Sequence, residues 1–181
     1  MRASLAFALF MACAITAPLL AAPALAAPAH GQPTAQRPRK LGEYQSWTAA
    51  TYGTGAEKVC YAFARARSID GVPNRNAQNV MLVVTHRPQG RDQVAVQSAY
   101  TYARNAEVPV HVGETALSFY GAQSSAFARD GRAAVAAFRS GREASARGPG
   151  PNNRGHANDT FPLNGFSQAY DAISRECPAR R

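Results

Sequence analysis

Apolar and polar residues alternate along most of the chain between residues 44 and 120, which predicts a series of short β-strands. Turn-forming Gly, Pro and Asn residues separate these runs. The predicted strands are 44–51, 58–65, 79–86, 93–102, 108–112 and 116–120. The strand 79–86 is apolar on both faces, which is typical of a central strand covered on both sides. Pro109 cannot donate a backbone hydrogen bond, so we expect its strand to lie at a sheet edge.

The apolar period lengthens in two later segments, which predicts two helices. Asp130 is the expected N-cap of a helix over 132–140, which ends before Gly141. Asn164 is the expected N-cap of the last helix. The residues at helical spacing on one face of that helix are Phe166, Ala169, Tyr170, Ile173 and Cys177. Residues 143–147 fit a further strand, so the sequence predicts an α+β fold: an antiparallel, sandwich-like β body with two helices in the C-terminal third.

The first 26 residues have the pattern of a cleaved secretory signal peptide. Arg2 provides a positive start, residues 5–20 are apolar, and Ala24-Leu25-Ala26 offers the small side chains that a signal peptidase reads. A membrane anchor is the alternative, but the apolar run is shorter than the roughly 20 residues that span a bilayer. We therefore predict a periplasmic or secreted protein with no transmembrane segment after signal removal.

The remaining 155 residues are enough for one domain. Residues 27–40 are rich in Pro, Gln and Arg and have little to bury, so we expect a disordered basic leader. Residues 41–181 are expected to form a single domain.

The chain is strongly basic. Removal of Arg2 with the signal leaves 19 basic and 11 acidic residues, a net charge of +8. Such an exported protein can bind nucleic acid, anionic lipid headgroups or acidic polysaccharide. The arginines are spread along the chain, and no stretch interleaves them with aromatic residues as in single-strand binders, so nucleic acid is the less favoured partner. An anionic envelope surface is favoured over it, and a compositional bias toward Arg and Ala is the alternative explanation of the charge.

Cysteine usage is consistent with export. Cys13 leaves with the signal, so Cys60 and Cys177 are the two cysteines of the mature chain. Two cysteines in an oxidising compartment usually pair. The chain has no Cys-x-x-Cys spacing for redox activity, and two cysteines without a histidine cluster make a poor zinc site. We predict a structural disulfide between Cys60 and Cys177.

Residues 148–159 form an unusually polar segment rich in Gly, Pro and Asn, which we interpret as a surface loop. Arg154, His156 and Asp159 lie close together in it. His156 and Asp159 can act as the acid–base pair of a hydrolase, although a His and an Asp in such loops more often fix turns. Arg154 and His156 can also donate hydrogen bonds to an anionic partner. These three are the candidate binding residues.

Motifs for catalysis and metal binding do not occur in the chain. The histidines have no metal-ligand spacing, and neither a Gly-x-Ser-x-Gly elbow, a Ser-x-x-Lys pair nor a Walker lysine is found. We therefore predict no metal, no cofactor and no catalytic residue. A Ser-His-Asp triad can form from residues far apart in the chain, and the sequence neither selects nor excludes one.

Several segments together resemble the invasion-associated locus B family of small exported alphaproteobacterial proteins. They are Trp47, residues 59–62, residues 84–88, and the block from Arg154-Gly155 through Asp159 to Phe166 that precedes Cys177. The chain departs from the family in the composition of the 148–159 segment and in lacking an additional cysteine near Trp47. The resemblance implies an envelope or secreted protein with no established enzymatic activity, and it does not by itself imply virulence.

The sequence thus favours an exported, non-catalytic protein that binds an envelope or anionic surface component. Two alternatives stay open at this point. One is a periplasmic hydrolase using His156 and Asp159, and the other is a structural or stress-protective envelope protein.

Overall fold

A computed structural model describes residues 37–179 of the chain. The expected signal peptide and residues 27–36 of the expected leader lie outside the described residues. The strands are β1 (Arg39–Tyr44), β2 (Trp47–Tyr52), β3 (Val59–Arg65), β4 (Ser68–Asp70), β5 (Met81–Arg87), β6 (Gly90–Gln97), β7 (Glu107–Val112), β8 (Thr115–Ala122), β9 (Ser125–Ala128), β10 (Glu143–Pro149) and β11 (His156–Pro162). The helices are α1 (Gly131–Ser140) and α2 (Phe166–Glu176), with 3₁₀ turns η1 (Gly55–Glu57), η2 (Ala77–Asn79) and η3 (Pro151–Asn153).

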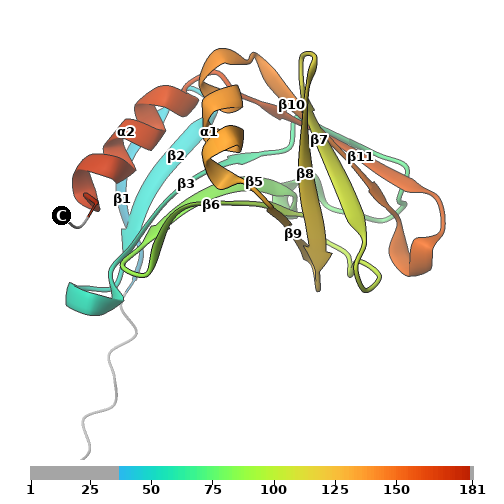
Figure 1. Cartoon of the computed structure of the whole chain (residues 1–181), viewed down its shortest axis with the longest axis horizontal. Coiled ribbons are helices and arrows are strands. Elements are labelled where there is room, and N and C mark those ends of the chain that lie inside the picture. Colours follow the sequence, from blue (N-terminus) through green and yellow to red (C-terminus); the bar gives the residue numbers. More distant parts are fainter. Residues whose placement is uncertain (1–36, 180–181) are drawn as a thin grey trace, which may run out of the picture. The chain divides into compact units, whose positions relative to one another are not determined.

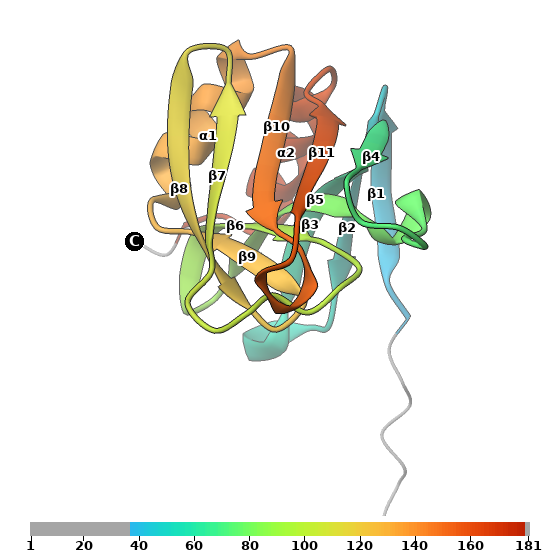
Figure 2. The ribbon, with the colours of Figure 1, turned by 90° about the vertical axis from the view of Figure 1, so that its right-hand side faces the viewer.

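Within residues 37–179, eleven strands form one antiparallel sheet in the order β1-β2-β3-β5-β6-β9-β8-β7-β10-β11-β4. The sheet bends into two layers. In Figure 1, β1, β2, β3, β5 and β6 form one layer, with α1 and α2 against its inner side. Figure 2 shows β7, β8, β10 and β11 as the second layer, lying in front of the first. The predicted α+β fold, with an antiparallel sandwich-like β body and two later helices, is confirmed.

The two layers are joined at one side by the bend between β3 and β4. β4 follows β3 after two residues, and its Ser68 lies opposite Thr160 of β11. The amide of Arg67, within the bend, donates to the Thr160 carbonyl at 2.8 Å. Because β4 continues the path of β3, the first layer meets the last strand of the second layer and the interior is enclosed there.

The interior is packed with alanine, branched aliphatic and aromatic side chains from the inward positions of the strands and from the helices. Trp47 is fully buried, and its Nε1 donates to the Pro162 carbonyl at 3.0 Å. The Trp47 ring packs edge-on against Phe166 with the centroids 4.9 Å apart, and Phe138 packs on Phe166 at 5.5 Å. These three aromatic rings come from β2, α1 and α2, so they fix both helices on the first layer.

The two helices differ in how they begin. In α1, Asp130 Oδ1 accepts from the Ala133 amide at 2.9 Å, which confirms the predicted N-cap. The predicted cap of α2 is wrong, because its N-cap is Gly165 at φ 89 and no side chain caps the helix. A β-carbon on Gly165 would lie 1.8 Å from the Tyr44 carbonyl oxygen, so the close approach of the β1–β2 hairpin requires glycine there. Neither helix is long and apolar enough to cross a membrane, and the described residues contain no other helix that is.

The first strand begins earlier than the sequence predicts. Arg39 and Lys40, expected in the leader, belong to β1. The predicted strand 44–51 covers most of β2 together with the turn that precedes it, where Gln45 has φ 53 and joins β1 to β2. β1 is an edge strand with exposed or half-buried side chains, so it lacks the alternation that would identify it.

Pro109 lies inside the sheet and not at its edge, because β7 has β8 on one side and β10 on the other. The ladder to β10 involves Val110 and His111 and ends next to Pro109. The missing N–H of Pro109 therefore falls just beyond the paired segment, which explains why proline is tolerated in an internal strand.

Candidate functional site

The predicted candidate residues do not come together. Arg154 is exposed in the turn between β10 and β11, and His156 is exposed at the first position of β11. Asp159 lies three residues further along the same strand and is only 2% exposed. Residues an odd number apart on a strand point to opposite faces, so His156 and Asp159 cannot share a proton. The predicted surface loop 148–159 is likewise wrong at both ends, because β10 extends to Pro149 and β11 starts at His156.

Asp159 forms a buried ion pair with Arg75, a residue of the segment between β4 and η2. The carboxylate lies 2.7 and 2.8 Å from the two terminal guanidinium nitrogens, and both side chains are 2% exposed. The guanidinium also donates to the carbonyls of Asp70 and Ser98, and it lies 5.5 Å from the Tyr100 ring centre. Burial raises the pKa of Asp159, while the hydrogen bond and charge of Arg75 oppose that rise. We interpret the pair as a structural element that closes this end of the interior.

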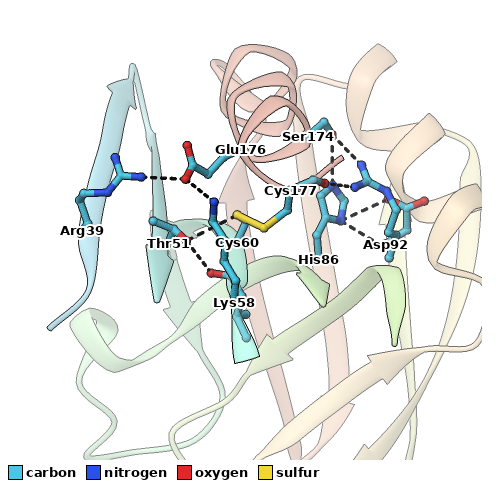
Figure 3. Close-up of a disulfide and its surroundings, with 11 residues drawn as sticks. Arg39, Thr51, Lys58, Cys60, His86, Asp92, Ser174, Glu176 and Cys177 are labelled. Carbon is cyan, nitrogen blue, oxygen red and sulfur yellow. Dashed lines mark hydrogen bonds and ion pairs between the residues drawn. A yellow bond between two sulfur atoms is a disulfide. The ribbon is translucent and has the colours of Figure 1, made fainter. Parts of the chain in front are cut away.

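The other end of the interior is closed covalently. Cys60 on β3 and Cys177 at the C-cap of α2 form a disulfide, with their Cα atoms 6.0 Å apart (Figure 3). The predicted bond is confirmed. The bond links the C-cap residue of α2 to the central strand of the first layer. There Cys60 is fully buried and lies opposite Thr51 of β2 and His86 of β5.

A serine, a histidine and an aspartate lie side by side next to the disulfide (Figure 3). His86 Nε2 is 3.1 Å from Ser174 Oγ, and His86 Nδ1 is 3.8 Å from an Asp92 carboxylate oxygen. The hydroxyl of Tyr170 donates to that same oxygen at 2.6 Å. The sequence left such a triad open, and these three residues are a candidate for one.

The hydrogen bonds of this group have the wrong polarity for a catalytic triad. The backbone amide of Asp92 donates to His86 Nδ1 at 3.3 Å, so Nδ1 carries the lone pair and Nε2 carries the proton. A catalytic histidine needs its free lone pair on Nε2, facing the serine. Burial, with a smaller contribution from Arg91, lowers the pKa of His86 to about 4. We therefore interpret His86 as a neutral donor that anchors α2 to β5, since Ser174 lies on α2.

A hollow of about 430 Å³ lies beside the disulfide. Its lining residues are Gly55, Lys58, Arg87, Pro88, Gln89, Gly90, Arg91, Arg132, Cys177, Pro178 and Ala179. Four of them are cationic and none is a carboxylate. We call this site, defined by Lys58, Arg87, Arg91 and Arg132, the cationic hollow.

The four cations are held in different ways. Arg91 donates to the Cys177 carbonyl and, at 3.0 Å, to Ser174 Oγ, so its guanidinium is fixed against the end of α2. Arg87 is exposed and uses its Nε to bind Gln93 at 3.1 Å, while Arg132 is exposed in the first turn of α1. Lys58 lies 2.6 Å from Glu176.

Among residues 37–179, the three arginines of the cationic hollow form no ion pair, whereas Lys58 is already paired. Guanidinium groups that converge without a carboxylate are suited to bind phosphate or carboxylate ligands. No group of three or more His, Cys, Asp or Glu residues within the described part of the chain could hold a metal ion.

Sequence reasoning missed the cationic hollow because its members are far apart in the chain. Arg87 and Arg91 flank the short turn between β5 and β6, and this local pair is the one signal that was available. Lys58 reaches the hollow because it immediately precedes β3, and Arg132 reaches it because α1 packs on β6. The α1 contact is close, because a β-carbon on Gly131 would lie 1.7 Å from the Asp92 carbonyl oxygen.

The fold and the site define an α+β protein, mainly β, in which one bent antiparallel sheet carries two helices on its inner side and a disulfide at one end. The sequence matches no family model and no curated protein. The structure is similar to the crystal structure of invasion associated protein B from Bartonella henselae, with a TM-score of 0.53 and 18% sequence identity. The match covers 75% of this chain and 96% of that chain. It confirms, at the level of the fold, the resemblance to the invasion-associated locus B family.

Proposed function

We propose that this chain is an exported, non-catalytic protein of the invasion-associated locus B type that binds an anionic component of the bacterial envelope in the cationic hollow. One observation carries the proposal: Lys58, Arg87, Arg91 and Arg132 line a hollow of about 430 Å³ that contains no carboxylate. A disulfide, a shared fold and an N-terminal segment of signal-peptide type support the exported location.

Electrostatics explains why an anion would bind here. Three arginines that line one hollow repel one another, and a bound anion offsets that repulsion while it accepts their hydrogen bonds. Arg91 is already oriented by Cys177 and Ser174, so it loses little conformational entropy when the anion arrives. The volume is within the range of small-ligand sites, which suits a phosphate or carboxylate group together with the part of the molecule that carries it.

The test is calorimetric titration of the purified exported protein with inorganic pyrophosphate at low ionic strength. Arg87→Gln and Arg132→Gln are the test variants, because both side chains are exposed and their loss should leave the fold intact. Each should weaken binding about tenfold, since each removes one charge-assisted contact. Arg142→Gln is the matched control, an exposed arginine without an ion pair among the described residues and outside the hollow.

Equal weakening by all three substitutions would show attraction to the net charge alone and would contradict the proposed site. A protein that binds no pyrophosphate at low salt would contradict the proposed function itself. Raising the salt concentration should weaken binding further, because the contacts are solvent-accessible.

A further inference from the structure

The outer face of the first layer is unusually apolar. Antiparallel sheets that pack one face on a core normally present polar residues on the other. Here the outward positions of β2, β3 and β5 carry Tyr52, Val59, Tyr61, Phe63, Met81 and Val83. These positions are adjacent across the strands, since Tyr52 lies opposite Val59 and Phe63 lies opposite Val83. Both α1 and α2 pack on the inner side, so neither helix covers this face (Figure 1).

The outward positions of β2, β3 and β5 carry positive charge only, and on the adjoining edge strand β1 the outward Glu43 is paired with Lys40 at 2.8 Å. Arg65 and Arg87 are the charged residues at the outward positions, and the segments β2, β3 and β5 contain no Asp or Glu at all. The Arg65 guanidinium lies 5.6 Å from the Phe63 ring centre, and the rings of Tyr61 and Phe63 stack with their centroids 6.2 Å apart. In the second layer, by contrast, the outward positions include Glu107 and Glu143.

This face is continuous with the cationic hollow. A second, shallow depression is lined by Pro38, Tyr52, Val59, Tyr61, Thr85 and Arg87. Arg87 lines both the depression and the hollow. One surface therefore combines aromatic rings, aliphatic side chains and uncompensated arginines. We call the part formed by Tyr52, Tyr61, Phe63, Arg65 and Arg87, with Val59, Met81 and Val83 between them, the tyrosine–arginine face.

We propose that the tyrosine–arginine face docks the protein on an anionic lipid surface. This inference rests on the proposed function and names the source of the anion: the phosphates of lipid headgroups. Tyrosine and phenylalanine rings favour the boundary between headgroups and acyl chains, and arginines beside them meet the phosphates. Aliphatic side chains add apolar area that can be buried at that boundary.

Two other partners fit the face less well. Val59, Met81 and Val83 lie among the aromatic rings and cannot stack on a nucleobase or a sugar ring. A second copy of the chain would bring together two faces whose strands β2, β3 and β5 carry arginines and no carboxylate, and the nearby Glu43 is already paired with Lys40. Charge complementarity therefore selects a partner that is negative and apolar at once, which describes an anionic membrane surface.

The test is co-sedimentation of the exported protein with lipid vesicles. Vesicles of phosphatidylcholine with about 30% phosphatidylglycerol provide a strongly anionic surface, and pure phosphatidylcholine vesicles are the neutral reference. The protein should partition onto the anionic vesicles and not onto the neutral ones. Arg65→Gln should lower the partition coefficient about fivefold, as expected for one arginine near a charged surface. The double variant Tyr61→Thr/Phe63→Thr should lower it about tenfold or more through lost apolar burial.

Tyr120→Thr is the matched control. Tyr120 is 41% exposed on β8 in the second layer and lies opposite Glu107, so its loss should not change partitioning. Threonine is chosen because it keeps strand propensity. If the double variant does not fold, Arg65→Gln and Tyr52→Thr provide the same test, since both side chains are exposed.

Pyrophosphate titration of the same variants separates the two proposals. The double variant should still bind pyrophosphate like the original protein, because Tyr61 and Phe63 do not line the hollow. A protein that binds pyrophosphate but shows no preference for anionic vesicles would overturn the lipid-docking inference and leave the proposed function standing. The lipid-docking inference would also be overturned if neither Tyr61→Thr/Phe63→Thr nor Arg65→Gln weakened vesicle binding. Binding only to acidic polysaccharide or to single-stranded oligonucleotide would overturn it as well.

Discussion

The two ends of the interior are closed by different chemistry, and strand β6 connects them. At its first residues, Arg91 contacts the cap of α2 beside the Cys60–Cys177 disulfide. Just beyond its last residue, the Ser98 carbonyl accepts from Arg75, the partner of Asp159. A covalent bond needs no exclusion of water, so the cations near it can remain accessible and form a hollow. A buried ion pair is stable only when each charge is compensated, so Arg75 and Asp159 bind each other and are not available to a ligand.

The largest effect is expected at the covalent end. Replacing both Cys60 and Cys177 with Ser should lower the free energy of unfolding by about 5 kcal/mol, because the bond closes a loop of more than 100 residues. Urea denaturation of the oxidised protein and the double variant measures this difference. The original protein unfolded with a reductant is the control, and it should match the double variant. A loss below about 1 kcal/mol would mean that the disulfide is not what holds this end together.

A slightly smaller loss is expected at the ionic end. Asp159→Asn should destabilise the protein by about 3–4 kcal/mol, because Arg75 is left buried and charged without its partner. Urea denaturation again measures the change. The double variant Arg75→Met/Asp159→Leu removes both charges and should recover most of the stability. Failure of this recovery would show that shape, and not charge pairing, matters at this end.

The disulfide end should also respond to pH through His86. Burial lowers the pKa of this histidine to about 4 in the folded protein, compared with about 6.5 in the unfolded chain. The unfolded state therefore takes up a proton first, and stability is fully present above pH 6.5. It should fall by up to about 3 kcal/mol as the pH drops from 6.5 toward 4, with no further loss from this group below that.

Comparison with His86→Gln isolates this contribution. The variant has no titrating group at position 86, so its stability should change less between pH 6.5 and 4 than that of the original protein. Urea midpoints measured across this range give the two slopes. Identical slopes would show that His86 is not the group responsible.

The smallest effect distinguishes the starts of the two helices. Asp130→Ala removes the cap of α1 and should cost about 1 kcal/mol. Asn164→Ala is the matched control, because this residue precedes α2 but makes only exposed hydrogen bonds to Ser46 and Gln45. Its cost should be about 0.5 kcal/mol or less. Thermal unfolding of both variants checks the order, and the reverse order would contradict the assignment of caps.

Local sequence patterns predicted those strands and helices whose formation depends on residues close together in the sequence. The run at residues 79–86 that is apolar on both faces identified β5, and Asp130 followed by an apolar helical period identified α1. The disulfide was predictable because Cys60 and Cys177 are the two cysteines outside the expected signal peptide. Gly165 was missed as the cap of α2, because the contact that requires it is the carbonyl of Tyr44, which is distant in the sequence.

The missed strand β11 shows why the candidate site could not be predicted. Its residues do alternate between exposed and buried, but one of the buried positions is Asp159, which breaks the apolar pattern. The residue that makes this burial tolerable is Arg75, 84 positions away, and no local rule connects the two. The cationic hollow depends in the same way on the packing of α1 beside the β5–β6 turn.

The link between Cys60 and Cys177 has a consequence for the order of events during folding. A chain that emerges N-terminus first presents Cys60 long before Cys177, which follows 117 residues later. β4 must likewise wait for β11, its partner in the sheet. Both closures depend on the last segment to appear, so β3 and β4 lack these partners until synthesis of the chain is nearly complete. Folding of this kind is slow, since its decisive contacts join distant parts of the chain. During that interval the thiol of Cys60 is without the partner that it has in the folded protein.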